Sequence, residues 1–327
     1  MKAIVHTQYG SPDLLEFRDV ERPEPASGEV LVEVHAASVT YGNLALVKGE
    51  PFIVRLMVGG LRKPVHKIQG SDLAGRVVEV GGDVHQFRPG DEVYGDLSEC
   101  GFGAYAEYVA APQDSLAMKP TNLTYEEAAT VPQAALVALQ GLRDLGRIKG
   151  GQQVLIVGAS GGNGSFAVQI AKLYGAEVTG VCSTRNIELV RSLGADYVID
   201  YTRDDFARNG KRYDLIFTTG GYRSIFDYRR ALKPEGTYIM AGGALKQVFE
   251  AMLLGSILSE KGGKRLVNLS QKPNQDDLAV MRSMIESGKV TPVIDRCYPL
   301  IETSQALSYY GSGHARGKVV ISIAPQE

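Results

Sequence analysis

Two apolar segments near the middle of the chain are separated by a cluster of small residues. The segment 154–157 ends at Gly158, and apolar residues at helical spacing follow over 166–174. This order predicts a buried strand, a tight turn and a helix. Glycine lets the backbone approach a pyrophosphate, and the free N–H groups at a helix start attract its negative charge. We therefore predict a dinucleotide phosphate site at Ala159, Ser160, Gly161, Gly162, Asn163 and Gly164.

The glycine cluster alone also fits an ordinary turn. A second apolar segment, 178–182, follows Gly175 and is typical of the next parallel strand. Strand, glycine turn, helix and strand together form a βαβ unit, which is the context in which such a turn binds a dinucleotide. This context favours nucleotide binding over a turn alone.

The residues after the second strand indicate which dinucleotide binds. NAD-binding chains carry an Asp or Glu there, which accepts hydrogen bonds from the ribose hydroxyls. Here Cys182 takes that position, and Ser183, Thr184 and Arg185 follow. We expect no carboxylate to repel a 2′-phosphate, both hydroxyls to donate to it and the guanidinium to pair with it, so NADPH is favoured over NADH. Ser183 and Thr184 also fit the N-cap of a helix over 187–193.

Further cofactor contacts follow from topology, because ligands bind at the carboxyl ends of parallel strands. Thr219 and Gly220 follow one predicted strand, and Gly242 follows the next. Tyr201, after the apolar segment 197–199, is a weaker candidate for the adenosine end of the cofactor. The glycines also fit turns alone, and the tyrosine also fits a half-buried loop position.

The composition is that of a soluble globular protein. The chain has 327 residues, is 44% hydrophobic and carries a formal net charge of −2. This near-neutral charge argues against nucleic-acid or anionic-membrane partners. The start of the chain resembles a strand rather than a signal peptide, and no apolar segment reaches membrane-spanning length, so we expect a cytoplasmic location without membrane insertion. The three cysteines are widely separated and are predicted to be free thiols.

The pattern of apolar residues divides the chain into three parts. Short alternating segments over 1–122 predict a mostly antiparallel β domain. Over 123–270, helical and strand periodicities alternate, which predicts a doubly wound parallel sheet. The last part, 271–327, returns to mixed character, with a predicted helix over 276–287 and a closing strand over 319–323.

Several motifs occur in a characteristic order: GSDLAG at 70–75, PGDEV at 89–93, GAYAEY at 103–108, the glycine turn at 158–164 and GHARGK at 313–318. Together they resemble the medium-chain dehydrogenase/reductase superfamily, specifically its zinc-free quinone oxidoreductase-like branch. The resemblance covers essentially the whole chain. It implies an α/β fold in which a GroES-like β-rich catalytic domain, built from the N-terminal part and the C-terminal tail, holds an inserted Rossmann domain. It also implies a homodimer.

The positions of the metal ligands differ from those of zinc-dependent relatives. Those relatives bind a catalytic zinc through Cys, His and Cys, and the motifs place Thr40, Ser71 and Gln133 there. They also carry a structural lobe with four cysteines, where this chain has only Cys100. These residues cannot supply the three or four thiolate, imidazole or carboxylate ligands that zinc needs, so we predict no zinc site.

The absence of zinc ligands constrains the substrate. Without a metal to polarise a simple carbonyl, the acceptor itself must delocalise the negative charge left by hydride addition. A quinone does so, as does a C=C bond conjugated to a carbonyl. The resemblance implies the same substrates, reduced with NADPH. The alternative is an NADPH-binding redox sensor or interaction protein with little catalytic activity.

Catalytic donors are predicted in the segment 38–43, which aligns with the family stretch that lines the nicotinamide pocket. Thr40 and Tyr41 are candidates for hydrogen-bonding the substrate oxygen, and Asn43 for orienting the cofactor or the backbone. A polar turn that supports the fold is the alternative for all three, and the proton can then come from water or from a ribose hydroxyl. Lys318 is a candidate cofactor contact, or else a solvated surface lysine.

The segment 48–67 combines charge with apolar residues. It holds five Lys or Arg residues and one Glu. Such a segment could form a lid over the active site or a patch that touches a membrane. Packing on its own domain, with the charges in water, is the interpretation we favour.

Overall fold

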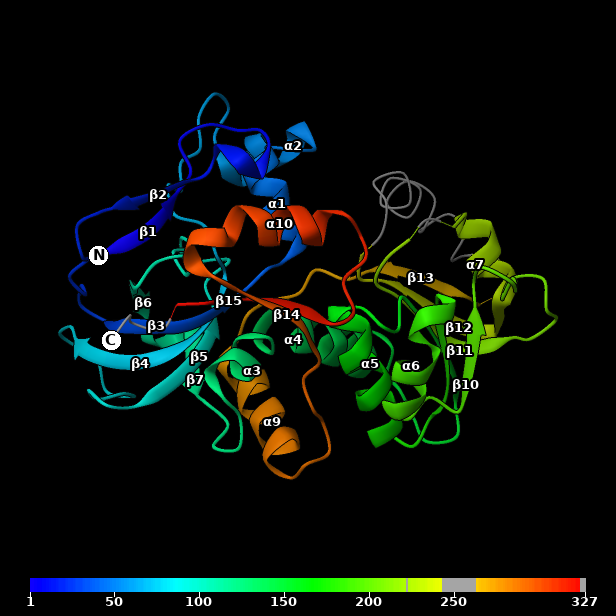
Figure 1. Cartoon of the computed structure of the whole chain (residues 1–327). Helices are drawn as coiled ribbons and strands as arrows, with labels where there is room; N and C mark the ends of the chain where they lie inside the picture. The colour runs from blue at the N-terminus through cyan, green and yellow to red at the C-terminus, as the bar shows by residue number, and fades with distance from the viewer. Residues whose placement is uncertain (222, 243–262, 324–327) are drawn as a thin grey trace. The chain divides into compact units, whose positions relative to one another are not determined.

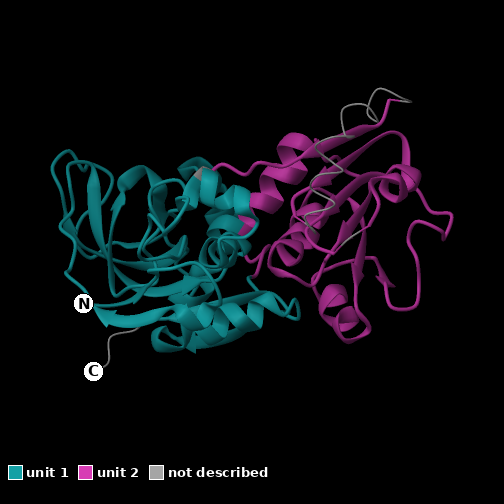
Figure 2. Cartoon of the chain, turned by 90° about the horizontal axis from the view of Figure 1, so that it is seen from above, with its two compact units in different colours: residues 1–133, 273–287, 292–327 teal, residues 134–272, 288–291 magenta. Residues whose placement is uncertain are grey.

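The computed structural model describes residues 1–221, 223–242 and 263–323 (Figure 1). The chain divides into two compact units, which Figure 2 colours separately. Unit 1 contains residues 1–133, 273–287 and 292–327, and unit 2 contains 134–272 and 288–291. The first boundary therefore falls after Gln133 rather than after residue 122. The described residues contain no helix with the length and apolarity needed to cross a bilayer.

Unit 1 contains a main β-sheet and a separate two-stranded sheet. Its strands are β1 Lys2–Val5, β2 Glu16–Asp19, β3 Glu29–Ser38, β4 Asp72–Val80, β5 Glu92–Asp96, β6 Tyr108–Pro112, β7 Leu116–Met118, β14 Ile294–Pro299 and β15 Lys318–Ser322. Its helices are α1 Tyr41–Lys48, α2 Phe52–Val54, α3 Tyr125–Ala129, α9 Gln275–Glu286 and α10 Thr303–Gly311, and the π-helical turn η2 spans Arg55–Gly59. Helix α4, Pro132–Gln140, begins in unit 1 and continues into unit 2.

The main sheet of unit 1 has the order β14-β15-β3-β4-β5-β7 among the described residues, and β6 also pairs with β3. β15 runs antiparallel to β3 and parallel to β14. The last part of the chain thus returns to the first domain, as the resemblance implied. Val30, Val32 and Val34 of β3 are buried in the core, and Leu31, whose side chain points to the other face, is buried as well, so both faces of this strand are covered.

Unit 2 contains a parallel sheet. Its strands are β8 Gln153–Val157, β9 Glu177–Cys182, β10 Tyr197–Asp200, β11 Tyr213–Thr218, β12 Leu232–Met240 and β13 Arg265–Asn268. Its helices include α5 Gly162–Leu173, α6 Ile187–Ser192 and α7 Ile225–Ala231. The strand order is β10-β9-β8-β11-β12-β13, and every neighbouring pair is parallel. In chain order this is 3-2-1-4-5-6, the doubly wound arrangement that was predicted.

Close packing fixes the helices of unit 2 on this sheet. A Cβ atom on Gly180 of β9 would lie 2.4 Å from Val190 Cγ1 of α6, so the strand has room only for glycine. Two stacked tyrosines, Tyr228 and Tyr238, bury their rings between α7 and β12 with centroids 4.6 Å apart. The chain order reverses between β8 and β11, and in such sheets ligands bind at the carboxyl ends of the strands on either side of the reversal.

Candidate functional site

The glycine turn follows β8 at this reversal point. Gly158 has a φ of +82°, a conformation that favours glycine. A Cβ atom on Gly164 would lie 2.0 Å from the carbonyl oxygen of Gly158, so only glycine allows α5 to begin this close to the strand. Gly162, Asn163 and Gly164 form the first turn of α5, and Ala159 is fully buried beneath it. The local structure agrees with the predicted strand, turn and helix.

The start of α5 fits an anionic group. Helix α5 has Gly161 as its N-cap and no side chain caps it, whereas α1 and α3 both begin with a capping box. A Cβ atom on Gly161 would meet only the Gly158 carbonyl oxygen, at 3.4 Å, so the space above this residue is open. Uncapped N–H groups facing open space suit a pyrophosphate. These residues therefore fit the phosphates of a dinucleotide.

The carboxyl end of β11 lies beside the turn. Thr219 Oγ1 donates to the carbonyl oxygen of Val157 at 3.2 Å, which ties the end of β11 to the end of β8. A Cβ atom on Gly242 would lie 2.9 Å from the carbonyl oxygen of Thr219, and one on Gly220 would meet nothing within 4 Å. Thr219, Gly220 and Gly242 thus gather at the strand ends where topology predicts the cofactor.

The segment after β9 differs from the prediction at Thr184. Thr184 Oγ1 donates to Asp200 Oδ2 at 2.5 Å, so its proton is not available to a 2′-phosphate. Asp200 is the last residue of β10 and lies opposite Cys182 in the parallel register. The expectation that no carboxylate lies near this segment is therefore wrong. The Thr184 hydrogen bond is the main reason why the pKa of Asp200 is below its ordinary value.

The predicted capping role of this segment is also wrong in detail. Ser183 stands at the N-cap of a short 3₁₀ turn, Thr184–Asn186, but its side chain makes no capping hydrogen bond. Helix α6 then begins at Ile187, again without a side-chain cap. Tyr201 is 59% exposed rather than half-buried, and its N–H donates to the carbonyl oxygen of Cys182 at 3.0 Å. An exposed ring beside Ser183 can stack on a base.

Asn186 is a residue that the sequence analysis missed. Its buried side chain donates from Nδ2 to Ser160 Oγ at 2.9 Å and to Ser183 Oγ at 3.3 Å. Its Oδ1 has no hydrogen-bond partner in the described part of the chain. One amide thus connects the glycine turn to the segment after β9. No periodicity or motif points to it, because its importance depends on contacts between separate loops.

In unit 1, the predicted catalytic residues lie at the start of α1. Thr40 and Asn43 form a capping box: Asn43 N donates to Thr40 Oγ1 at 3.2 Å, and Thr40 N and Oγ1 donate to Asn43 Oδ1. Tyr105, fully buried, also donates to Asn43 Oδ1 at 3.2 Å. Tyr41 is 57% exposed. The hydroxyl of Thr40 is therefore used within the fold, while Tyr41 presents its ring to solvent.

Comparison with known proteins identifies the family. A model of the alcohol dehydrogenase GroES-like domain matches residues 26–121, and a model of the zinc-binding dehydrogenase matches 193–321. The chain is 35% identical to 2-methylene-furan-3-one reductase of Solanum lycopersicum, over 99% of this chain and 80% of that protein. It is 34% identical, over the same shares, to the chloroplastic NADPH-dependent alkenal/one oxidoreductase of Arabidopsis thaliana.

The solved structures agree with these relatives. The quinone oxidoreductase from Coxiella burnetii superposes with a TM-score of 0.87 at 29% identity and covers 99% of each chain. The chain belongs to the medium-chain dehydrogenase/reductase superfamily. Within it, the chain is an oxidoreductase of the quinone oxidoreductase-like branch, with the GroES-like and Rossmann-like domains of that superfamily.

The residues that the motifs place at the zinc-ligand positions, Thr40, Ser71 and Gln133, differ in their contacts. Gln133 contributes its backbone N–H, which donates to Asp72 Oδ1 at 3.2 Å. The buried hydroxyl of Ser71 has no hydrogen-bond partner among the residues described. Together with the Thr40 hydroxyl, these are neutral oxygen and amide groups. They do not offer the thiolates and imidazole that hold zinc in the zinc-dependent members.

Lys318 of this dehydrogenase/reductase fold is a buried residue rather than a surface lysine. Its side chain is 5% exposed and its Nζ lies 3.2 Å from Asp72 Oδ2, which is fully buried. Nζ also donates to the carbonyl oxygen of Val39 at 3.3 Å. Burial raises the pKa of Asp72, and the charge of Lys318 opposes this effect. The expected contact of Lys318 with the cofactor stays a prediction.

The segment 48–67 does not bury its large apolar side chains on its own domain, which was the interpretation favoured from the sequence. Large apolar side chains of this segment are exposed, namely Phe52, Ile53, Leu56, Val58, Leu61 and Val65. Arg55, in contrast, is held by two contacts: its Nε donates to the carbonyl oxygen of Gly49 at 2.8 Å, and its guanidinium lies over the ring of Tyr9. The packing interpretation is therefore wrong for these apolar residues, while the lid and membrane interpretations stay predictions.

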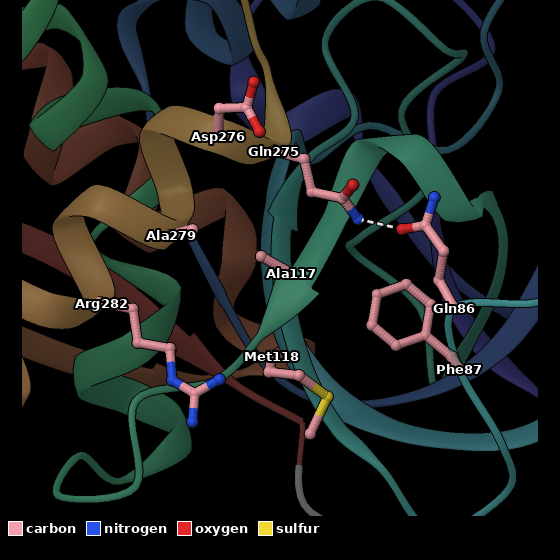
Figure 3. Close-up of a pocket in the computed structure, with 8 residues that line it drawn as sticks. All are labelled: Gln86, Phe87, Ala117, Met118, Gln275, Asp276, Ala279 and Arg282. Carbon is pink, nitrogen blue, oxygen red and sulfur yellow. Dashed lines mark hydrogen bonds between the residues drawn. The ribbon is translucent and has the colours of Figure 1, made fainter.

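A separate surface pocket of unit 1 lies between α9 and β7 (Figure 3). Gln275 of α9 and Gln86 hydrogen-bond to each other across it, and Met118 of β7 and Arg282 of α9 also line it. None of the predicted site residues lines this pocket. It does not belong to the candidate site.

Proposed function

We propose that this oxidoreductase uses NADPH to reduce quinones or the C=C bond of α,β-unsaturated carbonyls, without zinc. The observation that carries the proposal is the uncapped start of α5 at the reversal point of the sheet, with Ser183 and Arg185 after the neighbouring strand. The similarity to the alkenal/one oxidoreductase of Arabidopsis and to the quinone oxidoreductase of Coxiella supports the same substrates, and the NADPH dependence of the Arabidopsis protein supports the same cofactor.

The cofactor would be held by unit 2. The N–H groups of Gly162, Asn163 and Gly164 would receive the pyrophosphate. Ser183 accepts a hydrogen bond from Asn186, so its own proton is available to the 2′-phosphate, and Arg185 would supply the charge that pairs with it. Bound NADPH supplies the hydride. Asp200 lies at the end of the neighbouring strand β10, where its carboxylate accepts hydrogen bonds from the hydroxyls of Thr184 and Thr202.

The acceptor would meet the start of α1. Tyr41 is the exposed hydroxyl there and would donate to the acceptor oxygen, which stabilises the negative charge after hydride addition. Thr40 and Asn43 would orient this turn through the capping box rather than touch the acceptor. A quinone or a conjugated carbonyl delocalises that charge, so hydrogen bonds from one hydroxyl and from water suffice to stabilise it. Simple alcohols would need the metal that the ligand positions do not provide.

The test is NADPH oxidation by the purified protein with menadione and with an enone. We expect turnover that a zinc chelator does not reduce, and no oxidation of ethanol with NADP. Arg185→Ala should raise the KM for NADPH by about tenfold or more while that for NADH changes little. Tyr41→Phe should lower kcat/KM about tenfold, with the exposed Tyr197→Phe as the matched control.

Two results would contradict the proposal in different ways. Tight NADPH binding without turnover of either acceptor would favour the redox sensor or interaction protein. Stoichiometric zinc in the purified protein, or alcohol oxidation that a chelator abolishes, would overturn zinc independence. The homodimer and the cytoplasmic location stay proposals, to be checked by light scattering and by imaging of a tagged chain.

A further inference from the structure

A buried charge pair joins two strands of unit 1. Asp72 begins β4 and Lys318 begins β15, and both strands are hydrogen-bonded to β3, which lies between them. The carboxylate is fully buried, the lysine side chain is 5% exposed, and Nζ lies 3.2 Å from Oδ2. Removing two charges from water is costly, and apolar residues of similar size are often as stabilising in such a position. The stability of unit 1 alone is therefore a poor explanation for this pair.

Apart from the Gln133 N–H, which donates to Asp72 Oδ1, the other contacts of the pair converge on the end of β3. Ser38 Oγ donates to Asp72 Oδ2 at 2.9 Å, and Lys318 Nζ donates to the carbonyl oxygen of Val39 at 3.3 Å. Next to Lys318, the carbonyl oxygen of Val319 accepts from Val39 N at 2.9 Å. The two charged groups thus hold the side chain of Ser38 and the backbone of Val39 from opposite neighbouring strands.

The residues that follow form the candidate catalytic turn. Thr40 comes directly after Val39 and is the N-cap of α1, whose first residue is Tyr41. Tyr105 ties the two parts together, because its hydroxyl lies 3.4 Å from the carbonyl oxygen of Ser38 and 3.2 Å from Asn43 Oδ1. A shift of Ser38 and Val39 would therefore move the capping box and Tyr41 with it.

We propose that Asp72 and Lys318 are positioning residues for acceptor reduction, which hold Ser38 and Val39 so that Thr40, Tyr41 and Asn43 keep the geometry that the reaction needs. The inference rests on the proposed function, because it places the acceptor at this turn. Small misplacements of reacting groups lower rates strongly even when binding is preserved. The expected signature is thus a loss of kcat rather than of NADPH affinity.

The decisive variant is Asp72→Leu/Lys318→Met, which replaces the pair by apolar side chains. We expect its Tm to lie close to that of the wild type, because no buried charge is left unpaired. Its kcat with menadione should fall by about 10- to 100-fold, and its Kd for NADPH, measured by fluorescence titration, should change by less than about threefold. Lys318→Met alone should lower both Tm and kcat, because it leaves the Asp72 carboxylate buried and unpaired.

Two further variants separate positioning from general damage. Ser38→Ala keeps the charge pair and removes one contact to it, and it should lower kcat at an unchanged Tm. Lys119→Met is the matched control: this lysine side chain is 5% exposed, and it bonds to Pro120, Leu123 and Glu92, away from the end of β3. It should lower Tm and leave kcat within about twofold of the wild type.

The possible outcomes are distinct. The positioning role is refuted if the double variant keeps the wild-type kcat, or if its kcat and its Tm both return from the lowered values of Lys318→Met to those of the wild type. The proposed function stands in either case. If the double variant binds NADPH at least tenfold more weakly with an unchanged kcat, Lys318 is a cofactor contact and the inference is wrong. If the wild type binds NADPH but reduces no acceptor, both the proposed function and the inference fail.

Discussion

Asn186 Nδ2 lies 2.9 Å from Ser160 Oγ, so a buried amide links the glycine turn to the segment after β9. Both hydrogen-bond partners of this amide, Ser160 and Ser183, are serine hydroxyls. Asn186 Nδ2 donates to both, and Asn186 Oδ1 has no hydrogen-bond partner in the described part of the chain. The amide thus holds together the two segments at which we propose that the phosphates of the cofactor bind.

Replacing this amide should change cofactor affinity. We expect Asn186→Ala to weaken NADPH binding by about tenfold, because the two segments lose their link. Asn186→Asp should weaken NADPH binding more than NADH binding, since the new carboxylate repels the 2′-phosphate. Fluorescence titration with both nucleotides measures the two effects. Ser192→Ala, on the exposed side of α6, is the control, and equal losses for NADPH and NADH in Asn186→Asp would contradict the prediction.

The glycines of the turn should differ in the effect of an added methyl group. Gly161→Ala leaves the turn intact but fills the space over α5, so we expect NADPH affinity to fall at least about tenfold with little change in Tm. Gly164→Ala forces the helix away from Gly158 and should lower both Tm and affinity. Gly150→Ala is the control, because its Cβ would lie 3.5 Å from the nearest atom, in ordinary contact. Wild-type affinity in Gly161→Ala would argue against a phosphate there.

Acid stability should depend on the Thr184–Asp200 hydrogen bond. The pKa of Asp200 is below its ordinary value, chiefly because Thr184 donates to it. Such a carboxyl stabilises the fold at pH values above its unfolded pKa of about 3.9, and this contribution is lost as the pH falls through the folded pKa. Thr184→Val should therefore lower the free energy of unfolding at pH 7 more than at pH 3. Urea titrations at both pH values test this, and an equal loss at both would refute it.

The exposed apolar side chains of 52–65 should contribute little to stability. Leu56 is 60% exposed, so Leu56→Ser should change the free energy of unfolding by less than about 0.5 kcal/mol. Leu44 is buried against Gly311 of α10, and Leu44→Ala should cost about 2–5 kcal/mol. A raised KM for menadione in Leu56→Ser would support a lid, and a large loss of stability would show that the segment is covered in solution.

Most of the fold could be predicted because its signals are local. The apolar segments gave β8, β9 and α5 close to their observed bounds, and the glycine spacing placed the turn between them. A polar turn that supports the fold was one of the two alternatives for Thr40 and Asn43, but the capping box itself was not predicted, because it uses Asn43 where Glu or Gln is usual. The free thiols were predicted correctly.

The missed contacts depend on parts of the chain that only the fold brings together. Asp200 is 18 residues beyond Cys182 in sequence, and the parallel register of β9 and β10 places them side by side. The burial of Lys318 depends on Asp72, 246 residues away. The predicted strand order places the ends of β9 and β10 side by side, and Asp200 ends β10, so this order could have suggested Asp200. Nothing in the local sequence points to Asp72 as the partner of Lys318.

The position of β15 has a consequence for how the chain is made. β15 lies between β14 and β3 in the main sheet of unit 1, although it is the last strand of the described chain to be synthesised. While the ribosome is still adding these residues, β3 lacks its neighbour, and the carboxylate of Asp72 lacks its counter-ion. The parallel sheet of unit 2, whose strands are all encoded earlier, can assemble first. The parallel sheet of unit 2 is then complete before the main sheet of unit 1.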